Sequence, residues 1–274
     1  MSASITTKMR AVHHDTPLLR SLRIQLRVIG ALLMREIITR YGRHNIGFLW
    51  VFIEPMLFTL GVTALWTLTK STHGSSLPIT AFAVSGYSSV LLWRNCANRC
   101  ALAIQPNLSL LYHRNVRVID LFFARLVLEI SGATISAVVL TSFFSIVGLM
   151  ELPQNLSLVI GGWVYLAVFG SGLGLIVGAL SERSETADRL WHTIAYLLFP
   201  LSGSVFMVEW LPTSAQKLIL FLPMVHGVEM LRAGYFGSLV KPHYNVEFMV
   251  IADLVFLFVG LLMARDASKR VEPE

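Results

Sequence analysis

The stretch REIITRYGRHNIGFLWVFIEP, residues 35–55, decides how this chain folds. It begins as the end of a basic amphipathic segment and passes through a charged turn, RYGRH, at residues 40–44. It then enters an apolar run that carries Glu54 and Pro55 about two helical turns inside. A charged group in hydrocarbon is costly, and proteins usually retain one there for a pairing or a pathway. The role of Glu54 is therefore the first question about this chain, and Pro55 is expected to kink the helix beside it.

The composition places this stretch in a membrane protein. Of the 274 residues, 55% are hydrophobic and only 14% are charged, and the mean hydropathy is +0.66. Apolar runs between charges repeatedly reach the ~20 residues that a helix needs to cross a bilayer. We therefore predict an all-α polytopic membrane protein. The net charge of +6 does not indicate nucleic-acid binding, because the basic residues gather beside the predicted membrane boundaries.

No metal site is predicted from the sequence. Cys96 and Cys100 lie four residues apart in one apolar segment and have no companion ligands, so we expect buried, inert thiols. His192 and His226 likewise have no second ligand in the sequence around them.

Residues 1–45 are expected to form a cytoplasmic arm that contains one long amphipathic helix. Between residues 17 and 44, apolar side chains recur at helical spacing, at Leu18, Leu22, Leu26, Ile29, Leu33 and Ile37. A basic stripe accompanies them, made of Arg20, Arg23 and Arg27. This pattern predicts a helix in the membrane interface, with its arginines among anionic head groups. A helix packed against other protein is the alternative, and the two are compatible.

A transmembrane domain is predicted from residue 46 to 264, followed by a cytoplasmic tail, 265–274. Its six spans are expected near 46–69, 79–103, 121–149, 156–180, 190–208 and 246–264. Polar residues crowd the second half of span two, namely Arg94, Asn95, Asn98 and Arg99. Arg125 and Glu129 are one turn apart near the start of span three, and we expect them to pair with each other.

The distribution of lysine and arginine predicts that both termini are cytoplasmic. The arm is strongly basic, and the same side of the membrane receives Arg114, Arg117, Arg125, Arg183, Arg189, Arg265, Lys269 and Arg270. The opposite side receives Lys70, Lys217, Arg232 and Lys241.

Residues 210–236, WLPTSAQKLILFLPMVHGVEMLRAGYF, form neither a clean span nor a plain loop. Two apolar pieces flank Pro223, and each is too short to cross the bilayer alone. We predict a re-entrant helical hairpin over about 212–236, between spans five and six. His226, Glu229 and Arg232 share one face of its second limb, where Glu229 can pair with Arg232. These side chains either solvate the outer face of the hairpin or form an outer gate at the mouth of a pathway.

The cytoplasmic segment from residue 105 to 120 reads QPNLSLLYHRNVRVID. Apolar residues recur at helical spacing at Leu108, Leu111 and Tyr112, so a short amphipathic helix is predicted over about 106–118. Such a helix either rests on the lipid surface or docks into a groove of a soluble partner.

The depth of Glu54 follows from the helical rise of 1.5 Å per residue. Counted from about Ile46, Glu54 lies roughly 12 Å above the cytoplasmic boundary. Arg94, counted from about Ile79 on the other side, lies roughly 8 Å above that boundary in a core of ~30 Å, and Arg99 lies lower. We therefore predict that Glu54 pairs with Arg94 or Arg99. Glu54 would then be a structural pin and not a proton carrier.

Four pieces of this sequence, taken in order, resemble the ABC-2 type permeases. They are RYGRHNIGFLWVFIEP, PNLSLLYHRNVRVID, ARLVLE, and LPMVHGVEMLRAGYF before the last span. The resemblance extends from about Leu32 to Arg265 and is nearest to the inner-membrane permeases that export capsular polysaccharide, with O-antigen permeases as near relatives. The chain departs from the pattern at Leu222, where a polar residue is expected, and at Arg94, where a small or amide side chain is expected.

The resemblance implies a homodimer in the bacterial inner membrane that binds two copies of a separate ATPase subunit. ATP and Mg would then be held by that subunit, and this chain would carry no cofactor and catalyse no reaction. The sequence agrees in lacking a G-x-x-x-x-G-K-[ST] loop. The cargo would be a lipid-linked polysaccharide, and a periplasm-spanning export protein would be a further partner. The residues implied in coupling to the ATPase are Asn107, Leu108, Leu111, Tyr112, Arg114 and Arg117.

A glycan pathway requires aromatic faces on which sugar rings can stack. The candidates are Trp50, Tyr87, Trp93, Tyr196 and Phe199. Aromatic residues near membrane boundaries also serve as interfacial anchors, which is the alternative for each. A phosphate on the lipid anchor would require cations at the cytoplasmic entrance, where the candidates are Arg40, Arg43, Arg94 and Arg99.

Two other functions remain open at this stage. One is an ABC-2 permease for a different lipid or a drug. The other is an ion-coupled carrier that uses Glu54, Arg94, Arg99 and Glu129 as a relay, although such carriers often contain internal repeats and none is evident here. An intramembrane enzyme is disfavoured, because the sequence contains no evident set of paired acids, metal ligands or nucleophile with base.

Overall fold

The structure is a computed structural model, and it describes residues 17–41, 47–69, 77–111 and 116–271. Within these ranges the regular secondary structure is entirely helical, which confirms the predicted all-α class. The α-helices are α1 (Pro17–Tyr41), α2 (Gly47–Thr69), α3 (Ile79–Ala101), α4 (Leu108–Leu111), α5 (Val118–Ile146), α6 (Leu156–Arg183), α7 (Glu185–Leu201), α8 (Thr213–Ile219), α9 (Pro223–Phe236) and α10 (Val246–Val271).

Six of these helices coincide with the six predicted spans, namely α2, α3, α5, α6, α7 and α10. Among the described residues, α5, α6 and α10 are long and apolar enough to cross a membrane. The largest difference from the predicted boundaries is at α7, which was expected over 190–208. It begins earlier because the Ser184 side chain accepts a hydrogen bond from the Thr186 N–H. It ends earlier because the chain turns away at Gly203, whose φ is +82°.

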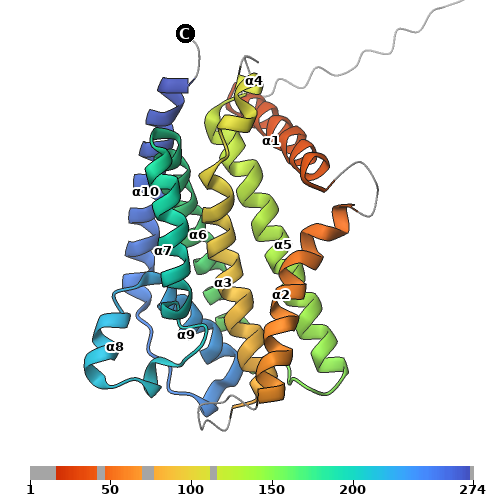
Figure 1. Cartoon of the computed structure of the whole chain (residues 1–274), viewed down its shortest axis with the longest axis vertical. Coiled ribbons are helices and arrows are strands. Elements are labelled where there is room, and N and C mark those ends of the chain that lie inside the picture. The colour runs from red at the N-terminus through yellow and green to blue at the C-terminus, as the bar shows by residue number, and fades with distance from the viewer. Residues whose placement is uncertain (1–16, 42–46, 70–76, 112–115, 272–274) are drawn as a thin grey trace, which may run out of the picture.

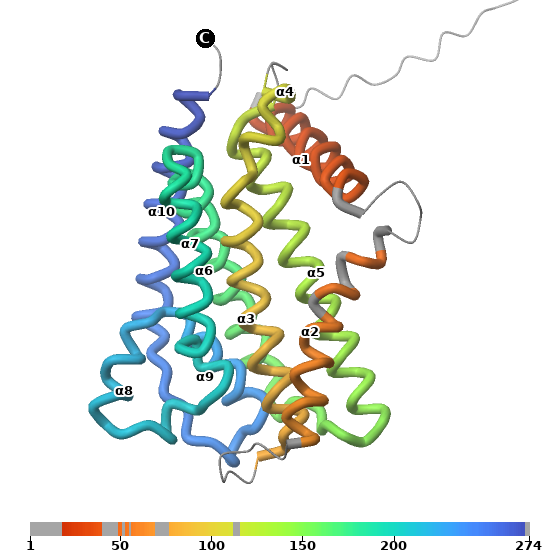
Figure 2. The backbone as a smooth tube through the Cα atoms, viewed as in Figure 1, coloured from red at the N-terminus to blue at the C-terminus, as the bar shows by residue number. Residues whose placement is uncertain are grey.

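The helices form an elongated bundle (Figure 1). Helices α3, α6, α7 and α10 run side by side, and α2 and α5 lean away from them. Helix α1 lies across one end of the bundle, beside α4 and near the end of α10 (Figure 2). The short helices α8 and α9 lie at the opposite end.

Helix α6 is central, and its glycines allow three neighbouring helices to approach closely. A Cβ atom added at Gly170 would lie 2.7 Å from the Cα of Trp93 in α3. A Cβ at Gly162 would lie 2.8 Å from the carbonyl oxygen of Gly227 in α9, and one at Gly172 would lie 2.8 Å from a backbone nitrogen of α10. Because lipid supplies little hydrophobic driving force between helices, close backbone packing of this kind is a main source of association in membranes.

The apolar residues of α1 have two different environments. Leu32 and Ile37, in its second half, are buried against α3 and α5. Leu18, Leu22 and Leu26, in its first half, are exposed. The predicted packing against protein is thus found for the second half of the helix, and the first half leaves an apolar stripe uncovered.

The segment predicted as one amphipathic helix over about 106–118 is shorter in the structure. A 3-10 turn at Gln105–Asn107 leads into α4, which ends at Leu111. Arg117 is not part of this helix, because it is the N-cap of α5 and its N–H donates to the Asp120 carboxylate at 2.9 Å. Tyr112 and Arg114 lie outside the described residues.

Helices α8 and α9 form the predicted helix–break–helix pair. They meet at an angle of 109°. The break precedes Pro223, which is the first residue of α9 and is favourable there because this position needs no backbone N–H.

Candidate functional site

Arg99 lies at the centre of a group of charges near the α1 end of the bundle. Its Nη2 atom lies 3.1 Å from the Glu54 Oε1 atom on α2, and its Nε atom lies 3.6 Å from the Glu129 Oε1 atom on α5. Of the two arginines predicted as partners of Glu54, the structure thus brings Arg99 to it. The Glu54–Arg99 pair is half exposed, so its contribution to stability is about 1 kcal/mol or less.

The same group of charges extends to α1 through Arg125. The Arg125 Nη1 atom donates to the Arg99 carbonyl oxygen at 2.6 Å, and its Nε atom lies 3.3 Å from the Glu36 Oε1 atom. Arg125 and Glu129 were expected to pair with each other, but Arg125 pairs with Glu36 on α1, and Glu129 pairs with Arg99 on α3. We call Glu36, Glu54, Arg99, Arg125 and Glu129 the Arg99 cluster. It connects α1 to α2 through α3 and α5.

A double-mutant cycle between Glu54→Gln and Arg99→Gln is expected to show a coupling energy of about 0.5–1 kcal/mol, because both side chains of the pair are about half exposed. The measurement is the free energy of unfolding in mild detergent. The matched control is the cycle between Glu54→Gln and Arg94→Gln, which should be additive. If Glu54 is coupled to Arg94 and not to Arg99, the Glu54–Arg99 ion pair is contradicted.

Two further contacts attach α1 to the segment before α5 and to the first turn of α5. Arg35 donates to the Asn107 Oδ1 atom, and Gln25 donates to an Asp120 carboxylate oxygen. Asn107 is buried, and its Nδ2 atom also donates to the Ala103 carbonyl oxygen at 2.8 Å. Of the residues implied in coupling, Asn107 and Leu111 are therefore buried within this chain, whereas Leu108 and Arg117 remain exposed.

On a different side of α3, aromatic rings from three helices meet. The Tyr87 ring centroid lies 5.4 Å from that of Phe199 on α7 and 5.9 Å from that of Phe58 on α2. The Arg94 Cζ atom lies 5.2 Å from the Phe199 ring centroid, within the range of a cation–π contact. The structure thus brings together Tyr87, Arg94 and Phe199, all three of which were predicted as pathway residues.

A small polar cavity of about 60 Å³ adjoins these rings. Its lining includes Arg94 and Asn98 from α3 and His192 and Tyr196 from α7. The Asn98 Oδ1 atom accepts a hydrogen bond from the Trp191 Nε1 atom at 2.9 Å. Among the described residues, the buried Arg94 Nε atom has no hydrogen-bond partner. We call Phe58, Tyr87, Arg94, Asn98, Tyr196 and Phe199 the aromatic–arginine face.

Other predicted pathway residues lie elsewhere. Trp93 is fully buried against Phe169 of α6, with ring centroids 6.3 Å apart, so it cannot stack on a sugar in this conformation. The physical reason is helical geometry, because neighbouring residues on a helix point about 100° apart, and Arg94 faces α7. Trp50 is half exposed on α2. The side chains of Arg40 and Arg43 lie outside the described part of the chain.

Glu229 and Arg232 share a face of α9, as predicted, but both are fully buried. The Glu229 carboxylate accepts hydrogen bonds from the backbone N–H groups of Val208 and His243, at 3.0 and 2.9 Å. Loops on both sides of α9 fold over this face and bring otherwise unpaired backbone groups to it. In this conformation Glu229 and Arg232 therefore neither solvate an outer surface nor line an open mouth.

Arg232 and His226 hold the loops in a similar way. The Arg232 guanidinium donates to the carbonyl oxygens of Gly203, Ser204 and Phe206, at 2.5, 2.6 and 2.7 Å. It also donates to the Phe82 carbonyl oxygen on α3, at 3.4 Å. The His226 Nε2 atom donates to the Leu220 carbonyl oxygen at 2.8 Å, because its Nδ1 atom accepts from the backbone N–H of Asn245. Three side chains on one helix face therefore join the segments on either side of α9.

Asp253 is an intramembrane carboxylate that the sequence analysis did not weigh. It lies within the apolar helix α10, and its buried Oδ1 atom has no hydrogen-bond partner among the described residues. The sequence contains a feature that could have identified Asp253, because this carboxylate interrupts an apolar run as Glu54 does. Within the described ranges, no group of three or more His, Cys, Asp or Glu residues could hold a metal ion.

Comparison with known proteins assigns the class of this helical bundle. A family model described as "ABC-2 type transporter" matches residues 27–236, and the chain belongs to this family. It is therefore a multi-pass membrane protein, and the family resemblance inferred from the sequence is confirmed.

The similar proteins include several with export functions in their names. "Capsule polysaccharide export inner-membrane protein CtrC" of Neisseria meningitidis serogroup B is 46% identical over 266 residues, which is 97% of this chain and 100% of that protein. "Capsule polysaccharide export inner-membrane protein BexB" of Haemophilus influenzae is 44% identical over 95% of this chain and 98% of its own length. "Polysialic acid transport protein KpsM" of Escherichia coli is 26% identical over 90% of this chain and 95% of its own length.

Proposed function

We propose that this chain is the transmembrane permease subunit of an ATP-driven ABC exporter that moves lipid-linked capsular polysaccharide across the bacterial inner membrane. The observation that carries the proposal is the identity of more than 40% to CtrC and BexB over nearly the whole of each chain. A match that covers nearly the whole of both chains favours the same architecture and the same class of cargo.

The proposed topology has six spans, α2, α3, α5, α6, α7 and α10, with α8 and α9 as a re-entrant hairpin. The proposed hairpin is supported by the lengths of α8 and α9, because each helix is too short to cross the bilayer alone. The α1 end of the bundle is assigned to the cytoplasm. This assignment rests on the basic residues at that end, Arg117, Arg183, Arg265, Lys269 and Arg270.

The ATPase subunit is proposed to dock at the cytoplasmic end, against α1 and α4. Leu108 and Arg117 are exposed there and are available to a partner. Arg35 and Asn107 join α4 to α1, and the Arg99 cluster joins α1 to α2. Movement of α4 by the ATPase would therefore reach α2, and the half-exposed Glu54–Arg99 pair is the contact that breaks most easily. ATP and Mg would bind only to the partner subunit.

A homodimer is proposed in which a second copy covers the aromatic–arginine face. Helices α2 and α7 flank this face and expose large apolar side chains, namely Leu57, Leu65, Leu190, Ile194 and Leu197. The polysaccharide would pass between the two copies. Exposed Tyr196 and the ring of Phe199 supply surfaces for sugar stacking, and Arg94, with one unpaired N–H, supplies a donor for the phosphate of the lipid anchor.

Deletion of the gene tests this function. Surface polysaccharide is expected to be lost while the polysaccharide accumulates inside the cell, and a plasmid copy of the gene should restore export. Immunolabelling of intact and permeabilised cells measures the two pools. Normal surface polysaccharide in the deletion strain would refute this cargo and favour an ABC-2 permease for another lipid or a drug.

A further inference from the structure

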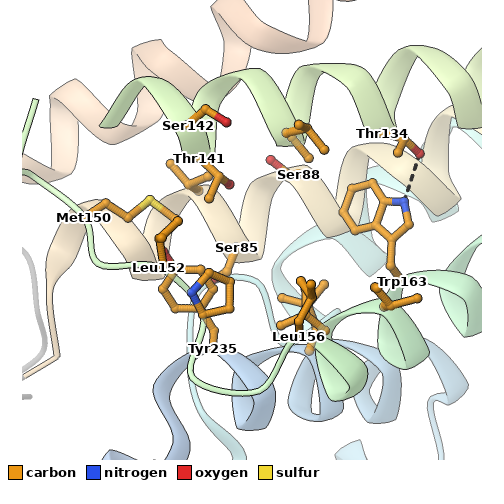
Figure 3. A pocket seen from close by; sticks show the side chains of 17 residues that line it. Ser85, Ser88, Thr134, Thr141, Ser142, Met150, Leu152, Leu156, Trp163 and Tyr235 are labelled. Atoms are coloured by element: carbon orange, nitrogen blue, oxygen red, sulfur yellow. Dashed lines mark hydrogen bonds between the residues drawn. The ribbon is translucent and has the colours of Figure 1, made fainter. Parts of the chain in front are cut away.

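A cavity of about 410 Å³ lies between α3, α5, α6 and α9, near the end of the bundle that carries α8 and α9 (Figure 3). It is separate from the aromatic–arginine face, because Ser85 and Ser88 reach it from a different side of α3 than Tyr87 and Arg94. Its volume falls within the range of about 300–1,000 Å³ that is typical of small-molecule sites.

The cavity is closed at its deep end and open at its side. The Trp163 Nε1 atom on α6 donates to the Thr134 Oγ1 atom on α5 at 2.9 Å, which closes the deep end (Figure 3). At the rim, Val138, Leu156 and Ile160 are more than half exposed. This rim is continuous with the apolar outer surfaces of α5 and α6, which face hydrocarbon in a membrane protein. The molecules that reach the opening are therefore membrane lipids.

The lining is mostly apolar, but one buried hydroxyl group in it, that of Ser88, lacks a partner among the described residues. Ser85 and Ser89 on α3 donate to the carbonyl oxygens three residues earlier, at 3.1 and 2.7 Å. The Ser88 hydroxyl, 6% exposed and lining the same cavity, has no hydrogen-bond partner among the described residues. A buried donor without an acceptor is unfavourable, so the wall of the cavity is incomplete without a ligand that supplies one.

We propose that this cavity binds one ester-linked membrane phospholipid by an acyl chain. The chain lies between α5 and α6 against Ile160 and Trp163, and an ester carbonyl accepts the hydrogen bond of Ser88. An acyl chain suits the apolar walls, in which water would find few partners. The ester carbonyl is the acceptor that such a lipid carries next to its chain. The ligand is a bilayer phospholipid and not the exported glycolipid, because the cavity is separate from the proposed pathway.

The test uses the purified full chain in mild detergent, incubated with equal amounts of dioleoyl-phosphatidylethanolamine and its diether analogue, which lacks ester carbonyls. Native mass spectrometry then counts the lipids retained per chain. We expect one diester lipid per chain, favoured about two- to tenfold over the diether, which corresponds to one hydrogen bond. Ser88→Ala is expected to remove this preference while leaving the lipid bound.

Blocking the cavity tests the location. Ala137→Phe fills it from α5 and is expected to reduce lipid retention about tenfold. The matched control, Val139→Phe, places the same ring on the exposed side of α5 and should retain lipid like the unmodified chain. Ile160→Trp at the half-exposed rim repeats the test if Ala137→Phe does not fold. Equal loss in Val139→Phe, equal binding of diether and diester, or recovery of the glycolipid cargo at this site would each overturn the proposal.

Discussion

Replacing Arg232 with alanine is expected to cost about 3–5 kcal/mol of folding free energy, because four backbone carbonyl groups would lose a charged donor in a buried site. Arg232 is fully buried, and its guanidinium lies over the Phe82 ring, with Cζ 3.8 Å from the centroid. The loop after α7 would lose the contacts that hold it to α9. The measurement is the yield of folded chain and its unfolding in mild detergent.

Two other variants control this prediction. Arg232→Lys should recover only part of the loss, because an ammonium group cannot reproduce the planar, forked donor set of arginine. Arg189→Ala removes an exposed arginine of α7 and should change stability by no more than about 0.5 kcal/mol. A loss below about 1 kcal/mol for Arg232→Ala would show that the loop does not depend on this side chain.

Placing a valine at Gly170 is expected to separate α3 from α6 and to cost about 3 kcal/mol or more. Even the Cβ of alanine would lie 2.7 Å from the Cα of Trp93, and backbone cannot move aside as a flexible side chain can. Gly170→Ala should therefore destabilise the chain by about 1–3 kcal/mol. Thermal unfolding in mild detergent measures both effects.

Gly61 offers a matched control within the same chain. It lies in α2, and a Cβ added there meets nothing within 4 Å. Gly61→Ala should therefore be neutral or stabilise the chain by up to about 1 kcal/mol, since alanine favours the helix and restricts the unfolded chain. If Gly170→Ala is as stable as Gly61→Ala, the close packing between α3 and α6 is not the source of stability that the geometry indicates.

Sequence reasoning succeeded where a single physical constraint acts along one helix. Hydrophobic length located α2, α3, α5, α6, α7 and α10, because a bilayer requires about 20 apolar residues for each span. Depth arithmetic placed Glu54 near the level of Arg94 and above Arg99, so it limited the partner to two arginines, of which the structure pairs Arg99 with Glu54. Both arguments need only the positions of residues along a helix.

Sequence reasoning failed where the environment of a side chain depends on how separate segments fold over one another. The helical face of Glu229 and Arg232 was predicted, but burial of that face depends on loops whose paths the sequence does not determine. Trp93 was assigned to the pathway because it is aromatic, but the residue type does not show which neighbouring helix the side chain faces. In the structure Trp93 packs on α6, where Gly170 leaves room for the close approach of α3. Asp253 could have been found by the criterion that identified Glu54.

The Arg99 cluster gives the opening stretch of sequence a physical role. Residues 35–41 end α1, and Glu54 lies on α2, the next helix along the chain. Arg35 contacts Asn107 beside α4, and Glu36 contacts Arg125, whereas Glu54 contacts Arg99. The stretch is therefore attached at one end to the proposed ATPase-facing segment and at the other to the proposed pathway helix.

The most direct measurement of the central claim is co-purification of an ATPase with this chain. The chain is tagged, expressed together with its neighbouring genes and purified in mild detergent, and the bound proteins are identified and assayed for ATP hydrolysis. A subunit with a P-loop is expected at one copy per chain. Less of it should be recovered with Arg117→Ala at the cytoplasmic end, but not with Lys217→Ala at the opposite end. Recovery of no ATP-hydrolysing partner by the unmodified chain would contradict the account.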